Sequence, residues 1–305
     1  MTGILETALG PLALKNPVIA ASGTFGYGVE HAELMDISRL GGISVKGISL
    51  QPRQGNPPPR VCETPSGMLN SIGLANIGYD AFVNGTMPRL RELGATVIVN
   101  TYGTSPEEFA ELARRFDTVP GVAALEVNIS CPNVKAGGIH FGVRPEFAAE
   151  VTRAVRGATA LPVIVKLSPE ASDLPSVAAA VAGAGADVIS MINTIRGMSI
   201  DVETRRPRLG AVMGGLSGPA IRPLAVRLIY EVHKAVPSIP IIGIGGVTCL
   251  RDALELMLAG ASAVQVGTAS YSNPLTCVEI IEEMETYFSS RNLRPADIVG
   301  KVIVG

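Results

Sequence analysis

Short runs of apolar, mostly β-branched residues recur along the chain. Within each run the apolar residues are consecutive, which is typical of strands buried on both faces of a parallel sheet. Eight such runs cover residues 17–22, 42–48, 95–102, 123–130, 162–168, 187–194, 240–246 and 263–268.

Helical patterns lie between these runs. Residues 105–108 read Ser-Pro-Glu-Glu, a capping box with proline at the first helical position. Residues 219–236 and 250–259 have apolar positions at helical spacing. Eight strands that alternate with helices predict an α/β protein with the (β/α)8 TIM-barrel architecture. An open, doubly wound sheet is the alternative, although it ordinarily uses fewer strands.

Two connections are longer than a plain strand-to-helix loop. Residues 49–77 follow the second run and residues 195–217 follow the sixth, and a third insertion follows the fourth run. All three leave the carboxyl ends of strands, where barrels place their active sites. Because no low-complexity linker divides the chain, we expect a single domain over residues 1–305.

Composition and charge restrict the possible partners. The chain has 305 residues, 47% of them hydrophobic and 17% charged, with a mean hydropathy of +0.34. This composition excludes a disordered chain and suggests that another subunit covers part of the surface. The formal net charge is −2 and the basic residues are scattered, so we expect no nucleic-acid partner.

Cysteine and histidine spacing give no sign of a metal site. The four cysteines form no CxxC pair, and we expect neither a disulfide framework nor an iron–sulfur cluster on this chain. Residues 1–17 lack a secretory pattern, and no uninterrupted apolar run reaches about 18 residues. We therefore expect a cytoplasmic protein that does not enter a membrane.

Polar side chains stand where the apolar runs end. Capping a helix or satisfying a loop carbonyl would explain any one of them. As a set on one barrel rim they favour a polar ligand, because a buried polar group is costly without a partner. The residues are Ser22, Lys46, Asn100, Asn128, Lys166, Asn193 and Thr194, with Asn70 in the first long connection.

Two of these residues are lysines within otherwise apolar strands. A lysine in that position needs an anion, unless it extends its ammonium group to solvent. A flavin that becomes anionic on reduction would supply the anion for Lys46 or Lys166.

Glycines end the last two runs, at 243–246 (GIGG) and at Gly267-Thr268. Barrels commonly bind phosphate there, because glycine lets backbone N–H groups approach the ligand, and Gly218 fits the same cradle. Tight turns also use glycine, so the string alone does not decide. No GxGxxG motif follows the first run, which argues against a dinucleotide site.

Cys131 follows the fourth run directly, in the string Ser-Cys-Pro-Asn. A thiol can act as a general base near neutral pH, and the glycines at 137, 138 and 142 would let this loop move as a lid. An inert structural cysteine is the alternative.

Taken together, several strings resemble the dihydroorotate dehydrogenase family over residues 16–270. They are VKGIS (45–49), NSIGLAN (70–76), EVNISCPN (126–133), VKLSP (165–169), INT (192–194), GGLSGPAIRP (214–223), GIGGV (243–247) and VGT (266–268). The resemblance implies a (β/α)8 barrel that holds one FMN per chain at its carboxyl rim. It also implies oxidation of dihydroorotate to orotate in pyrimidine biosynthesis.

Within the family, residues 126–138 and 197–210 resemble the class 1 B type. That type implies a partner subunit that carries FAD and a 2Fe–2S cluster and passes electrons to NAD+. We expect a homodimer of this chain within a heterotetramer with that partner. The fumarate-linked A type is the alternative inside the family. Outside it, a non-redox phosphate-binding lyase or isomerase and an inactive scaffold subunit stay open.

The resemblance also implies individual roles. Cys131 would be the base that takes the substrate's C5 proton, while the C6 hydride goes to flavin N5. The residues implied to hold the substrate are Lys46, Asn70, Ser71, Ile72, Gly73, Leu74, Asn128, Asn193 and Thr194. Those implied to hold FMN are Ser22, Lys46, Gly47, Asn100, Asn128, Lys166, Ile192, Gly218, Gly245, Gly246, Gly267 and Thr268.

Overall fold

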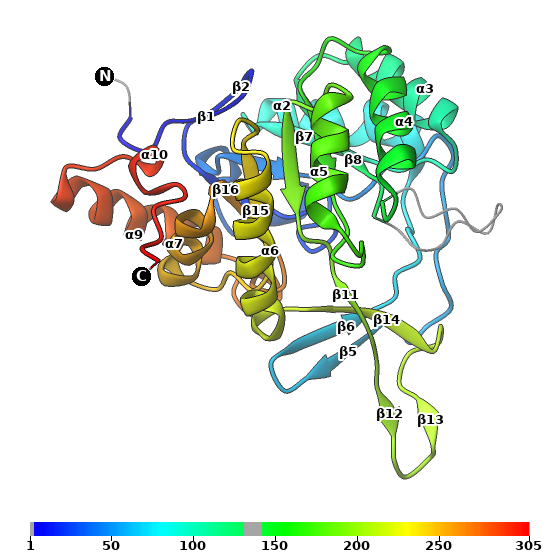
Figure 1. The fold of residues 1–305 in the computed structure, drawn as a ribbon. Helices are drawn as coiled ribbons and strands as arrows, with labels where there is room; N and C mark the ends of the chain where they lie inside the picture. Colours follow the sequence, from blue (N-terminus) through cyan, green and yellow to red (C-terminus); the bar gives the residue numbers. More distant parts are fainter. Residues whose placement is uncertain (1–2, 131–141, 305) are drawn as a thin grey trace.

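Eight parallel strands close into a barrel and follow one another around it in chain order (Figure 1). The computed structural model describes residues 3–130 and 142–304, so Cys131 lies outside the described residues. Each predicted run overlaps one strand, although β8 and β16 begin one and two residues before their runs, and the predicted barrel architecture is confirmed. The strands are β3 (Val18–Ala20), β4 (Gly42–Ser44), β7 (Val97–Thr101), β8 (Val122–Asn128), β9 (Val163–Lys166), β10 (Val188–Met191), β15 (Ile241–Ile244) and β16 (Ala261–Val266).

Helices cover the outside of the barrel. Ser105 caps α3 by accepting a hydrogen bond from the Glu108 N–H, as predicted, but the Glu108 carboxylate accepts from Thr104 rather than from Ser105. The helices are α1 (Gly78–Ala81), α2 (Met87–Glu92), α3 (Pro106–Asp117), α4 (Pro145–Arg156), α5 (Leu174–Gly183), α6 (Arg222–Ala235), α7 (Leu250–Ala259), α8 (Ala269–Ser272), α9 (Thr276–Arg291) and α10 (Pro295–Ile298). The helix expected over 219–236 begins with a 3₁₀ turn, Pro219–Ile221, before α6.

The two long connections pair with each other, which the sequence did not predict. They form a four-stranded antiparallel sheet in the order β11-β14-β6-β5, here called the rim sheet. It lies beyond the carboxyl ends of the barrel strands (Figure 1). Its strands are β5 (Val61–Thr64), β6 (Gly67–Asn70), β11 (Ile195–Met198) and β14 (Met213–Ser217), and the ribbon β12 (Ile200–Asp201) and β13 (Arg206–Pro207) extends from it.

A hairpin of β1 (Thr7–Leu9) and β2 (Leu12–Leu14) lies at the opposite end of the barrel from the rim sheet (Figure 1). Its leucines pack against inward-facing strand residues and form an apolar floor. The floor consists of Leu9, Leu12, Leu14, Ile19, Ile98, Ala124, Ile164, Val188, Ile242 and Ala263. The barrel is therefore sealed at its amino end, and the polar side chains of the strands lie toward the other end.

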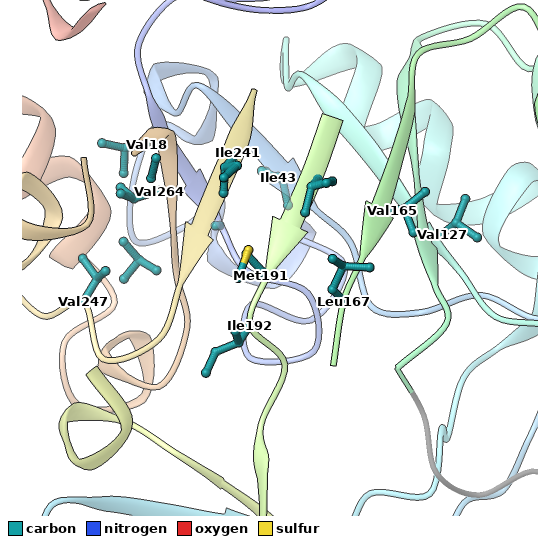
Figure 2. Close-up of a cluster of buried hydrophobic side chains, with 14 of the residues drawn as sticks. Val18, Ile43, Val127, Val165, Leu167, Met191, Ile192, Ile241, Val247 and Val264 are labelled. Atoms are coloured by element: carbon teal, nitrogen blue, oxygen red, sulfur yellow. The ribbon is translucent and has the colours of Figure 1, made fainter. Parts of the chain in front are cut away.

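A second, larger core lies between the strands and the helices. Successive side chains of a strand point to opposite faces, so the residues that directly precede or follow a floor residue in the sequence point outward, toward the helices. Figure 2 shows part of this layer, including Val18, Ile43, Val165 and Val264. Apolar residues on both faces of the strands explain why the runs are continuous rather than alternating.

Replacing Leu9 with alanine should lower the free energy of unfolding by about 3 kcal/mol, because a fully buried floor residue leaves a cavity that a closed ring of strands cannot fill. Leu34→Ala is the control: Leu34 is 59% exposed, and we expect a change under about 0.5 kcal/mol. Urea unfolding followed by circular dichroism measures both. Equal effects of the two substitutions would contradict the floor's role.

Candidate active site

A layer of polar side chains lies directly above the apolar floor, here called the polar layer. Five of its members stand two positions beyond a floor residue, and the two-residue period of a strand keeps them on the inner face. All six are buried. The polar layer consists of Ser44, Asn100, Glu126, Lys166, Ser190 and Gln265.

Two hydrogen bonds from this layer span the barrel between opposite strands. Gln265 Nε2 on β16 donates to Glu126 Oε1 on β8 at 2.9 Å. Lys166 Nζ on β9 donates to Ser22 Oγ, just after β3, at 3.2 Å. These bonds show that polar groups from opposite sides of the barrel meet inside it, although Ser190 Oγ and Gln265 Oε1 have no partner among the described residues.

Glu126 is the centre of the layer. Its Oε2 accepts hydrogen bonds from Ser44 Oγ and from Asn100 Nδ2, each at 2.7 Å. Burial raises the pKa of the Glu126 carboxyl, but the positive charge of Lys166 and three hydrogen bonds outweigh it, so the net pKa lies below its ordinary value. The carboxylate is therefore ionised at neutral pH, although the side chain is 0% exposed.

Two adjoining cavities open above the polar layer. One of about 180 Å³ lies at the ends of β3, β10, β15 and β16, and one of about 600 Å³ lies over β4, β7 and β8 beneath the rim sheet. Lys166, only 5% exposed, is the one cationic side chain from the described residues in the smaller cavity. Residues that line both cavities are Ser22, Gly23, Asn70, Ile72, Lys166, Asn193 and Thr194.

Glycines shape the smaller cavity. Gly218, Gly245 and Gly246 all have positive φ, at 98°, 134° and 73°. A Cβ on Gly246 would lie 2.7 Å from Arg222 Cβ, and one on Gly218 would lie 2.7 Å from Gly67 Cα. Other residues are strained at these angles, so glycine keeps the backbone in place and leaves room for a ligand. Beside them the Thr268 hydroxyl donates to Ser217 Oγ at 2.8 Å.

Amide side chains line the larger cavity. Ser130 donates to Asn128 Oδ1 at 2.7 Å and accepts from Asn193 Nδ2, which links the ends of β8 and β10. Asn70 Nδ2 donates to the Gly215 carbonyl of the rim sheet at 3.3 Å. A Cβ on Gly215 would lie 2.0 Å from Thr194 Oγ1, so only glycine lets the rim sheet approach this closely.

The loop before the rim sheet packs on residues 71–74. Asn56 Nδ2 donates to Ser71 Oγ at 2.8 Å, and its backbone N–H donates to the Ile72 carbonyl at 3.0 Å. Lys46 lines the larger cavity, and burial together with the positive charge of Arg60 lowers its pKa. An anionic group beside Lys46 would counteract both effects, because its negative charge stabilises the protonated ammonium group.

Apart from Cys131, every predicted site residue lines one of the two cavities. Sequence reasoning missed several other residues. Glu126 lies in the polar layer and lines neither cavity, and its charge inside an apolar run is a signal that could have found it. Asn56 lines the larger cavity but stands in a loop with no motif. Ser130, Ser168, Glu170 and Arg196 also line the larger cavity.

Comparison with known proteins identifies the family. The model of the dihydroorotate dehydrogenase family matches residues 4–288. This chain belongs to the dihydroorotate dehydrogenase family. The family inferred from the motifs is thereby confirmed, and a non-redox lyase or isomerase is ruled out.

Relatives within the dihydroorotate dehydrogenase family match nearly the whole chain. A protein of Trichlorobacter lovleyi is 54% identical over 98% of this chain and 97% of its own length. One of Desulforamulus reducens is 55% identical over 95% of each chain, and one of Geotalea uraniireducens is 51% identical over 98% of each. All three are named as the catalytic subunit of dihydroorotate dehydrogenase B (NAD+).

Membership in the dihydroorotate dehydrogenase family implies a flavin, and the two cavities fit one. Gly218, Gly245 and Gly246, here called the glycine cradle, suit a phosphate, and the amide-lined cavity beside Lys166 suits a ring with several donors and acceptors. Among the described residues, no three histidine, cysteine or acidic side chains gather as a metal site would require. No helix in the described ranges is long and apolar enough to cross a membrane.

Gly246→Ala should weaken the binding of a flavin that carries a phosphate at least about tenfold, because the new Cβ meets Arg222 and the residue leaves its positive φ. Gly183→Ala is the control: it lies at the end of α5, and an added Cβ there meets no atom within 4 Å. Quenching of FMN fluorescence during titration measures both affinities. Equal affinities for the two variants would show that the cradle does not hold the phosphate.

Proposed function

We propose that this chain is the catalytic subunit of an NAD+-linked dihydroorotate dehydrogenase. It oxidises (S)-dihydroorotate to orotate in de novo pyrimidine biosynthesis and uses one FMN per chain. The observation that carries the proposal is the pair of cavities joined at buried Lys166, one suited to a phosphate and the other lined by amides. The names of the relatives favour this B type over the fumarate-linked A type.

FMN would lie across both cavities. Backbone N–H groups around the glycine cradle and the Thr268 hydroxyl would bind its phosphate. Lys166 and Asn100 would face the ring, and Lys166 would stabilise negative charge that develops there. The remaining FMN residues in this proposal are Ser22, Lys46, Gly47, Asn128, Ile192, Gly218, Gly245, Gly246 and Gly267.

Dihydroorotate would occupy the larger cavity. Its carboxylate matches the positive charge of Lys46, and its ring amides match asparagine side chains that both donate and accept. Hydrogen bonds from the loop at Asn56 hold the neighbouring backbone in place. The substrate residues in this proposal are Lys46, Asn70, Ser71, Ile72, Gly73, Leu74, Asn128, Asn193 and Thr194.

Cys131 would be the catalytic base. It lies outside the described residues, but it follows Ser130, whose hydroxyl joins Asn128 to Asn193 in the larger cavity. Bound FMN supplies an acceptor for the hydride that leaves the substrate. The thiolate of Cys131 would take the proton from the adjacent carbon, while the asparagines and Lys46 hold the substrate in place.

Cys131→Ser should retain FMN but lose most flavin reduction by dihydroorotate near neutral pH, since a serine hydroxyl is a far weaker base than a thiolate. Stopped-flow absorbance between pH 6 and 10 measures the rate (roughly the range that spans a free thiol pKa of about 8.5). Rates like those of the unmodified chain across this range would exclude Cys131 as the base.

Electrons would leave through a partner subunit. The chain has no GxGxxG motif for a dinucleotide and no CxxC pair for an iron–sulfur cluster. Hydride transfer to a nicotinamide requires contact between the two rings, and the substrate and the barrel would cover the flavin faces. A partner that carries FAD and a 2Fe–2S cluster would relay the electrons to NAD+, in a heterotetramer built on a homodimer of this chain. We place this assembly in the cytoplasm.

The chain alone should reduce its FMN with dihydroorotate yet form little NADH, and NADH should form once the partner subunit is added. Steady-state absorbance of NADH, with and without the partner, measures this difference. NADH production by the chain alone would overturn the B-type assignment. Rapid turnover with fumarate, and none with NAD+ after the partner is added, would indicate the A type.

A further inference from the structure

Glu126 is a fully buried carboxylate that lines neither cavity. It also makes no ion pair closer than 4 Å with any described residue, so its charge is held by three hydrogen bonds and the field of Lys166. Burying a charge is expensive, and a neutral side chain of similar size would pack the barrel at lower cost. Because Glu126 is buried at this free-energy cost, we expect it to affect the residues that do line the cavities.

The first effect is on the orientation of Asn100. An ionised carboxylate only accepts hydrogen bonds, so Asn100 must turn its Nδ2 toward Glu126 and its Oδ1 away from it. Asn100 Oδ1 then lies against Gly47 in the larger cavity, 2.9 Å from where a Cβ on Gly47 would stand. Glu126 thus presents the cavity with a hydrogen-bond acceptor rather than a donor.

The second effect is on charge. Lys166 lines both cavities, and it stands on β9, which pairs directly with β8, so the buried negative charge of Glu126 lies on the neighbouring strand in the polar layer. The negative charge of Glu126 therefore partly offsets the positive charge that Lys166 offers to a ligand in the cavities. For a bound flavin, this offset sets how strongly the site favours the reduced, more negative form.

We propose that Glu126 is a positioning residue for the flavin, which fixes the acceptor of Asn100 and limits the positive charge of Lys166. The inference rests on the proposed function, because it requires FMN in these cavities. It assigns the role to a residue that touches neither FMN nor substrate, so its effects must pass through Asn100 and Lys166.

Glu126→Gln tests the charge. The glutamine oxygen can keep the bonds from Ser44 and Asn100. Its new N–H₂ can donate to Gln265 Oε1 once the Gln265 amide turns over, since Gln265 now presents its Nε2 to Glu126 and its Oε1 has no partner within the described residues. The fold should therefore tolerate it. We expect a higher midpoint potential for bound FMN, measured by photoreduction against a reference dye. An unchanged or lower potential would overturn the proposal.

Glu126→Met tests the orientation of the Asn100 side chain. Methionine is similar in length to glutamate but cannot accept the hydrogen bond from Asn100 Nδ2. FMN affinity should fall at least about tenfold, and this loss should vanish when Asn100 is already alanine. The same loss in both backgrounds would overturn the proposal. If one variant fails to fold, the other still tests its own half of the proposal: Glu126→Gln tests the effect on charge, and Glu126→Met tests the orientation of Asn100.

Asp187→Asn is the matched control. Asp187 accepts hydrogen bonds from Arg156 at 3.0 Å and from the Val163 N–H at 2.8 Å, next to the amino ends of β9 and β10. It should lower stability and leave the potential unchanged. If the unmodified chain binds no FMN, the proposed function has failed; if it binds FMN and the glutamate variants match it, only this inference has failed.

Discussion

An ionised carboxylate and an ammonium group share the inside of a barrel that is otherwise built from apolar strands. Neither Glu126 nor Lys166 reaches bulk solvent, so each depends on groups contributed by other strands. Two of these hydrogen bonds join opposite strands of the ring, and therefore form only when the barrel closes in this register. Closure of the barrel and assembly of the site are thus one event, with the apolar floor below and the two cavities above.

The rim sheet supplies a part of the larger cavity's wall that the barrel strands do not form. Its strands come from two connections that are far apart in the sequence, and they meet where β14 pairs with β6, with Gly215 opposite Asn70. This brings Asn70 beside the residues that end β10. A ligand in the larger cavity would thus be enclosed by barrel strands on one side and by the rim sheet on the other, which limits the access of water to the reacting atoms.

The sequence predicted the barrel because strands buried on both faces leave continuous apolar runs. It predicted the rim residues because Lys46 and Asn128 are polar interruptions at the ends of such runs. Glu126 was missed although it also interrupts a run, since its partners lie on strands distant in sequence. The rim sheet was missed because its short strands are not fully buried, and apolar and polar residues do not alternate along sequences such as VCET and MGGLS. The role of Cys131 still rests on its motif, because it lies outside the described residues.

The central claim is that the polar layer supports a flavin that dihydroorotate reduces. Anaerobic titration of the FMN-loaded chain with dihydroorotate, followed by visible absorbance, tests it most directly. The account predicts that the oxidised flavin bands bleach as substrate is added and return when oxygen is admitted. A chain that binds FMN but keeps its oxidised spectrum with excess dihydroorotate would contradict the account.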